Sequence, residues 1–124
     1  MEKYEIEFPL NTSSSLLYMR LSTPSGLGEW FADDVFVAQD KFIFVWEKNE
    51  QIAFLKENRK NEKVKFKWED SNDNEYFEFS IRNNPVTGDN ALIITDFAEN
   101  SEEKEDAIQL WKKQVSKLKS VLGL

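Results

Sequence analysis

Residues 101–122 read SEEKEDAIQLWKKQVSKLKSVL, and their apolar side chains recur with the period of an α-helix. The apolar stripe has successive spacings of 3, 4, 3 and 4 residues and consists of Ile108, Trp111, Val115, Leu118 and Leu122. Acidic residues gather at the start of this stretch and lysines toward its end, as the helix dipole favours. Asn100 with Glu103 resembles a capping box. We therefore predict a long amphipathic helix whose stripe must pack against another element.

The rest of the chain is dominated by the two-residue period of β-strands. Tyr4, Ile6 and Phe8 alternate with charged residues and predict a first strand. Between residues 34 and 97 the alternation recurs in segments separated by polar turns, which predicts about six strands in an antiparallel meander. One of these turns is predicted at Lys48-Asn49-Glu50, with Ile52 and Phe54 on the strand that follows it. Residues 13–31 lack this period and predict two short helices, one ending near Ser22 and the next starting at Pro24.

This order of elements predicts an α+β fold of the helix-grip type. An antiparallel sheet of about seven strands would wrap around the long C-terminal helix, with two short helices after the first strand. The length of 124 residues fits a single domain over residues 1–124.

Composition excludes several classes of function. The chain has neither cysteine nor histidine, so it has no disulfide, no thiol nucleophile and no imidazole chemistry. We expect no metal site and no cofactor. With 16 basic and 23 acidic residues the net charge is −7, which argues against a nucleic-acid partner. The acidic start is not a secretory signal and no stretch is apolar enough to span a membrane, so we expect a cytoplasmic protein.

Three groups of residues resemble the START-like superfamily of helix-grip proteins, and within it the activators of the heat-shock ATPase. They are residues 8–31, with the turn Leu21-Ser22-Thr23-Pro24 and the pair Trp30-Phe31; residues 40–46; and residues 111–122. The chain departs from that group at Asp96-Phe97-Ala98, where a glycine–aromatic pair is usual, and at Leu110, which replaces a glycine. The resemblance implies a cavity between sheet and long helix. Relatives use it for lipids, sterols or polyketides, a few are cyclases or hydratases, and some act through protein contacts.

The alternation predicts a set of aromatic side chains directed into the space between sheet and helix. They are Trp30, Phe44, Trp46, Phe54, Phe66, Trp68, Phe79 and Trp111. These rings either line a pocket for a flat apolar ligand or fill the core completely. For a pocket, the hydroxyls of Tyr18, Tyr76 and Thr95 and the indole N–H groups are candidates for orienting a ligand.

Other polar clusters have ordinary explanations beside functional ones. Asp33 and Asp34 either bind a cation or form a solvated turn. The acidic cluster from Asp96 to Asp106 either docks a basic partner or matches the helix dipole. The lysines of residues 63–67 alternate with apolar residues and so lie on the opposite face, which does not make a stacking platform for nucleic acid. Ser13 and its neighbours fit helix capping rather than catalysis.

We therefore expect a non-enzymatic protein that binds a small apolar ligand, lipid-like or aromatic, in the sheet–helix cavity. Two alternatives remain open. One is a protein-interaction module similar to the chaperone-ATPase activators, with a filled core and a protein partner. The other is a cyclase- or hydratase-like enzyme with an inward carboxylate or tyrosine of shifted pKa. The protein is expected to be a monomer or a homodimer.

Overall fold

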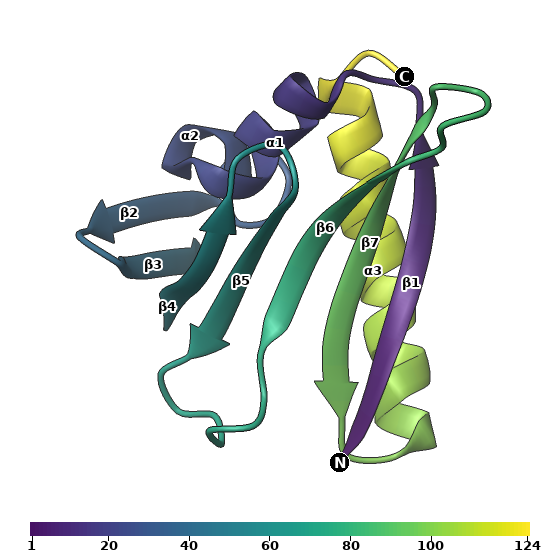
Figure 1. Cartoon of the computed structure of the whole chain (residues 1–124). Coiled ribbons are helices and arrows are strands. Elements are labelled where there is room, and N and C mark those ends of the chain that lie inside the picture. Colours follow the sequence, from purple (N-terminus) through teal and green to yellow (C-terminus); the bar gives the residue numbers. More distant parts are fainter.

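A seven-stranded antiparallel sheet curves around a long C-terminal helix in the computed structural model, which describes residues 1–124 (Figure 1). The helices are α1 (Ser14–Ser22), α2 (Pro24–Leu27) and α3 (Ser101–Val121). The strands are β1 (Glu2–Leu10), β2 (Asp34–Ala38), β3 (Lys41–Trp46), β4 (Asn49–Arg59), β5 (Lys63–Trp68), β6 (Phe77–Asn83) and β7 (Asn90–Ala98). The predicted α+β helix-grip architecture is confirmed.

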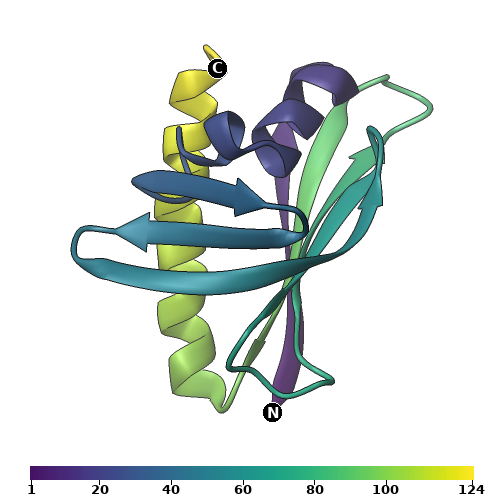
Figure 2. The same ribbon diagram turned by 90° about the vertical axis from the view of Figure 1, so that its left-hand side faces the viewer.

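The strand order is β1-β7-β6-β5-β4-β3-β2. Strands β2 to β7 pair consecutively, and β1 joins the far edge by pairing with β7. Figure 2 shows β2, β3 and β4 crossing over α3, while β1 and β7 run along it. The sheet therefore covers α3 from two directions, and the apolar stripe of α3 is buried in the core inside the curve. None of the helices combines the length and the apolar character needed to cross a membrane.

Each helix begins at the cap that its sequence predicts. The Ser13 hydroxyl accepts a hydrogen bond from the backbone N–H of Leu16 at 3.2 Å, at the start of α1. Asn100 does the same for Glu103 at 2.8 Å, at the start of α3. These bonds satisfy N–H groups that have no partner inside the helix.

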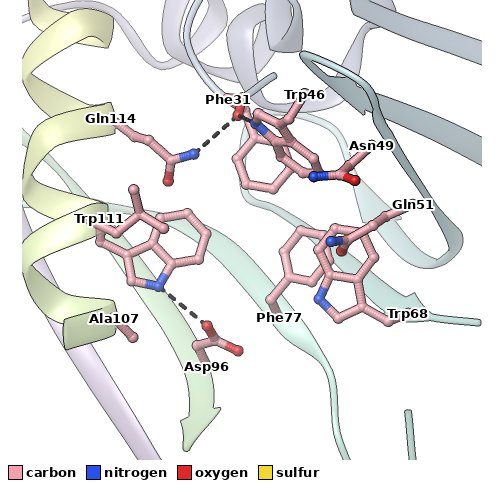
Figure 3. Close-up of a pocket in the computed structure, with 11 residues that line it drawn as sticks. Phe31, Trp46, Asn49, Gln51, Trp68, Phe77, Asp96, Ala107, Trp111 and Gln114 are labelled. Atoms are coloured by element: carbon pink, nitrogen blue, oxygen red, sulfur yellow. Dashed lines mark hydrogen bonds between the residues drawn. The ribbon is translucent and has the colours of Figure 1, made fainter. Parts of the chain in front are cut away.

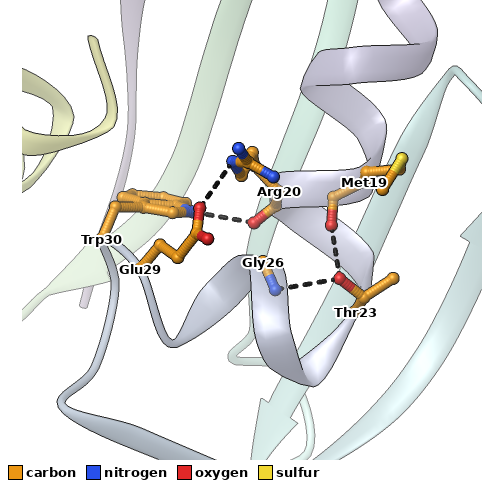
Figure 4. Close-up of polar contacts among 6 residues, drawn as sticks. All are labelled: Met19, Arg20, Thr23, Gly26, Glu29 and Trp30. Carbon is orange, nitrogen blue, oxygen red and sulfur yellow. Dashed lines mark hydrogen bonds and ion pairs between the residues drawn. The ribbon is translucent and has the colours of Figure 1, made fainter. Parts of the chain in front are cut away.

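The junction between α1 and α2 is a tight turn around one hydroxyl group (Figure 4). The Thr23 hydroxyl donates to the backbone carbonyl of Met19 at 2.7 Å and accepts from the N–H of Gly26 at 3.0 Å. Gly26 is buried so closely against α1 that an added Cβ would lie 2.2 Å from the Met19 carbonyl oxygen. Only glycine fits at this position.

The same junction fixes Trp30, which follows α2. The indole N–H of Trp30 donates to the backbone carbonyl of Arg20 at 2.8 Å, and Arg20 pairs with Glu29 at 2.9 Å (Figure 4). Trp30 is 2% exposed. The two short helices thus set the position at which the chain enters the core.

Two local predictions were wrong. Phe54 lies on the outer face of the sheet, because its cross-strand neighbours are Lys41 and Lys67, and Lys56 lies 5.7 Å from its ring. The inner position belongs to Ala53, between Phe42 and Trp68 of the adjacent strands.

The second correction concerns the β3–β4 turn. It lies at Glu47 and Lys48, one or two residues before the predicted one. Glu47 adopts a positive φ of 51° there, which makes a tight turn between strands.

We expect Gly26→Ala to lower the free energy of unfolding by about 1–3 kcal/mol, because the added methyl meets a backbone carbonyl that cannot rotate away. Chemical denaturation measures this effect. Ser25→Ala is the matched control on the exposed side of α2 and should change stability by less than about 0.5 kcal/mol. Equal stability of the two variants would contradict the packing described for this junction.

Candidate functional site

The side chain of Phe31 lies at the centre of an aromatic cluster between the sheet and α3. Its backbone N–H donates to the Leu27 carbonyl at 2.9 Å, so α2 determines where the ring enters the core. Ring centroids 5.0–5.8 Å from that of Phe31 belong to Trp30, Phe44, Trp46, Phe77, Phe79 and Trp111. Offset and edge-to-face ring pairs at these distances are favourable beyond the area that they bury.

The backbone carbonyl of Phe31 connects the layers of the fold. It accepts hydrogen bonds from the indole N–H of Trp46 at 2.8 Å and from the side-chain amide of Gln114 at 3.0 Å (Figure 3). Trp46 comes from β3 and Gln114 from α3. One carbonyl group therefore sets the separation of sheet and helix at this point.

Beside this cluster a pocket of about 390 Å³ lies between the sheet and α3 (Figure 3). Its apolar lining consists of Phe31, Trp46, Trp68, Phe77, Ala107, Leu110 and Trp111. Its polar lining consists of Asn49, Gln51, Asp96 and Gln114. A mostly aromatic lining with a few polar groups is typical of sites for small organic molecules.

Asp96 is the charged group of this pocket. Its Oδ2 accepts hydrogen bonds from the indole N–H of Trp111 at 3.2 Å and from the Tyr4 hydroxyl at 3.3 Å. Its Oδ1 accepts from the backbone N–H of Phe97 at 2.8 Å. The strand pairing explains the position, because Asp96 on β7 lies opposite Tyr4 on β1.

Burial raises the pKa of the Asp96 carboxyl above its usual range, and the nearby Glu103 carboxylate adds to that rise. The hydrogen bonds from Phe97, Trp111 and Tyr4 act in the opposite direction, because they stabilise the ionised form. Burial and the charge of Asp96 also raise the pKa of the Tyr4 hydroxyl, so Tyr4 remains protonated and donates. The folded state therefore holds the Asp96 proton more tightly than the unfolded chain does. As pH rises from the ordinary carboxyl pKa through the raised pKa of the folded state, the contribution of Asp96 to the free energy of unfolding falls.

The eight aromatic residues predicted from the sequence separate into three groups. Trp46, Trp68 and Trp111 line the pocket. Trp30, Phe44, Phe66 and Phe79 are buried in the core beside it, and Phe54 lies outside. The core is thus filled at one end and open at the other. That these residues contact a ligand stays a prediction.

The hydroxyls predicted to orient a ligand are absent from the pocket lining. Tyr18 donates to Asn58, and Tyr76 lies under the Lys65 ammonium, 4.0 Å from its ring centroid. Thr95 is buried and faces away from Asp96 along the strand. Of the predicted polar groups, only indole N–H groups belong to residues of the pocket.

The remaining polar clusters take structural roles. The Asp33 carboxylate accepts a hydrogen bond from the backbone N–H of Glu47 at 2.7 Å. The Asp34 carboxylate accepts one from the backbone N–H of Val35 at 3.0 Å. Both bonds fit the interpretation of this pair as a solvated turn. Asp96 does not belong with the acidic residues of the α3 start, because its carboxyl faces the pocket.

Sequence reasoning missed two residues that dominate the site, Phe31 and Asp96. The signal for Asp96 was present, because Leu92 and Ile94 on the same strand are fully buried core residues and a two-residue step reaches Asp96. Phe31 follows a one-turn helix and belongs to no periodic pattern. Its role is visible only in three dimensions.

We expect Trp111→Phe to raise the pKa of Asp96 further, because the substitution removes a donor to the ionised carboxylate. A ¹³C NMR titration of the aspartate carboxyl groups measures it. Trp46→Phe is the matched control: it changes another indole of the pocket, one that donates to Phe31 and not to Asp96. A pKa that falls in Trp111→Phe, or that shifts equally in both variants, would contradict this account.

Several solved structures share the fold. The Aha1 dimer from Colwellia psychrerythraea has a TM-score of 0.82 at 15% identity, with 98% of this chain and 96% of that chain covered. The protein MLL2253 from Mesorhizobium loti has a TM-score of 0.80 at 12% identity, with 98% and 97% covered. DynU16, a putative protein in the dynemicin biosynthetic locus, has a TM-score of 0.79 at 9% identity, with 99% of this chain and 48% of that chain covered.

At these identities the similarities establish the fold alone. No curated protein matches the sequence of this chain. The family model of the START-like superfamily domain matches residues 1–124, the whole chain. With the helix-grip fold and the pocket between sheet and helix, this match shows that the chain belongs to the START-like superfamily.

Proposed function

We propose that this protein binds a small apolar molecule, lipid-like or aromatic, in the pocket between the sheet and α3, without converting it. The observation that carries the proposal is the pocket itself, with Trp46 and Trp68 on the sheet side and Trp111 on the helix side. Its volume of about 390 Å³ lies in the range of small-molecule sites, roughly 300–1,000 Å³.

The lining rings are held in place before any ligand enters. Trp46 is fixed by its bond to the Phe31 carbonyl and Trp111 by its bond to Asp96. A preorganised pocket favours binding, because little side-chain entropy is lost when the ligand enters. An apolar molecule would also restore the packing that an open space beside aromatic rings lacks.

The absence of cysteine suits a reducing compartment, and the cytoplasm is the location we propose.

A second candidate is a protein-interaction module, favoured by an apolar line on the outer face of the sheet. Phe36, Ile43 and Ile52 are cross-strand neighbours on β2, β3 and β4, and Phe36 is 55% exposed. The structural relative from Colwellia psychrerythraea is described as a dimer. A homodimer or another protein partner would cover this line while the pocket stays empty.

A third candidate is an enzyme of the cyclase or hydratase kind, favoured by Asp96. A carboxyl group of raised pKa in an aromatic pocket is suited to general acid–base catalysis. The neighbouring pocket groups are amides and indoles, and Tyr4 is held protonated, so a partner base for Asp96 is missing from the lining. The binding proposal needs no such partner.

Native mass spectrometry of protein purified gently from its own host tests the proposal. We expect an extra mass that disappears on denaturation. Ala107→Trp places a large side chain in the pocket and should abolish that mass. Ser116→Trp, at an exposed position on α3, should retain it. A wild-type protein without extra mass would contradict ligand binding, and a clean dimer in that case would favour the interaction module.

A further inference from the structure

The carboxylate of Asp96 has no cationic partner. It takes part in none of the ion pairs of the molecule, and the residues that line the pocket include no lysine and no arginine. All three groups that donate to it are neutral: a backbone N–H, an indole and a phenol. A partly buried carboxylate without a counter-charge is unfavourable unless a cation reaches it.

No cationic side chain of the elements packed around Asp96 pairs with it, and Phe77 of β6, which lines the same pocket, is uncharged. On α3, the Glu103 carboxylate has the same sign as Asp96. The Lys104 ammonium, also on α3, is bound to the Glu2 carboxylate of β1 at 2.9 Å and lies 5.9 Å from the centroid of the Tyr4 ring. The remaining neighbour from β1 is the neutral Tyr4 hydroxyl. The carboxylate of Asp96 therefore lines the pocket without an ion-pair partner of its own.

The hydrogen-bond geometry leaves room for one more donor. A carboxylate has about four acceptor sites, and Asp96 uses three of them. Both acceptor positions of Oδ2 are occupied, by Tyr4 and Trp111. The free position belongs to Oδ1, which accepts only from the backbone of Phe97.

The aromatic lining adds a second attraction for a cation. Trp68 and Trp111 border the same space as Asp96, together with Phe77 (Figure 3). The faces of these rings attract cations, and tryptophan does so most strongly. The net charge of −7 adds a long-range attraction in the same direction.

We infer that the ligand of this pocket is an organic cation: an aromatic or alkyl amine whose protonated nitrogen donates to Asp96 and whose apolar part lies among Trp46, Trp68 and Trp111. This inference rests on the proposed ligand-binding function and narrows its ligand class. Electrostatics explains the preference, since an ammonium restores the counter-charge that the protein lacks. An apolar acid would instead place two negative charges together.

The pKa of Asp96 gives the sign of the pH dependence. Burial raises that pKa, and a bound ammonium would lower it again, because opposite charges favour the ionised form. At pH values where Asp96 is protonated, amine binding therefore releases that proton. Affinity for an amine should weaken as pH falls through the titration of Asp96, whereas affinity for a neutral analogue should not.

The test compares 2-naphthylmethylamine with 2-naphthylmethanol, which have the same ring system and differ in charge. The ¹H–¹⁵N signals of the indole groups report binding: Trp68 and Trp111 line the pocket, whereas Trp30 donates to the Arg20 backbone elsewhere. We expect the amine to bind at least about tenfold more tightly than the alcohol, as is usual for a charge-assisted hydrogen bond.

Asp96→Asn should reduce the ratio of the two affinities to about one, because the variant removes the negative charge that attracts the ammonium. Glu103→Gln is the matched control, because it removes a nearby carboxylate of α3 that does not line the pocket. That variant should keep the preference for the amine. The pH series on the wild-type protein gives an independent measurement that needs no variant.

The outcomes separate the two proposals. Equal affinity for amine and alcohol in the wild-type protein, or a preference for the alcohol, would overturn the cation inference and leave the pocket as an apolar site. A preference for the amine that survives Asp96→Asn would also overturn it. Failure of both probes to shift the signals of Trp68 and Trp111 would overturn the cation inference and count against the proposed function as well.

Discussion

The backbone carbonyl of Phe31 accepts hydrogen bonds from Trp46 of the sheet and from Gln114 of α3, and the rest of the site depends on this junction. The ring of the same residue lies inside the aromatic cluster. The short helix α2 also positions this residue, because the Phe31 backbone N–H donates to the Leu27 carbonyl. The two short helices therefore do more than connect strands. They deliver one residue whose carbonyl joins the sheet to α3 beside the pocket.

Beside that junction, aromatic side chains close the core at one end and border an open space at the other. At one end, rings such as Phe66 and Phe79 are fully buried and close the core. At the other end, the inner positions next to the rings carry Ala107 on α3 and Gln51 on β4, which leave volume unfilled. Asp96 lies at this open end, held by neutral donors. Three hydrogen bonds offset part of the cost of burying this carboxylate, which has no counter-charge among the ion pairs of the protein.

Much of the fold was predictable because it depends on local patterns. Periodic or short-range signals in the sequence mark the apolar stripe of residues 108–122, the caps at Ser13 and Asn100, and the strand alternation. The face on which a strand is buried is a non-local property, and here the prediction failed at Phe54. Alternation favoured the large residue, but the neighbouring strands fill the inner space and leave only the small Ala53 there. Alternation would have placed Asp96 on the inner face, whereas Phe31 had no such signal. The pocket volume depends on packing that no pattern encodes.

We propose that the space between the sheet and α3 is a ligand site rather than a gap in a filled core. A crystal structure of the protein, purified gently from its own host, tests it most directly. We expect electron density for a bound molecule between Trp68 and Trp111, with one end within hydrogen-bonding distance of Asp96. Density that shows Trp68 and Trp111 packed against each other, with no space between them, would contradict it.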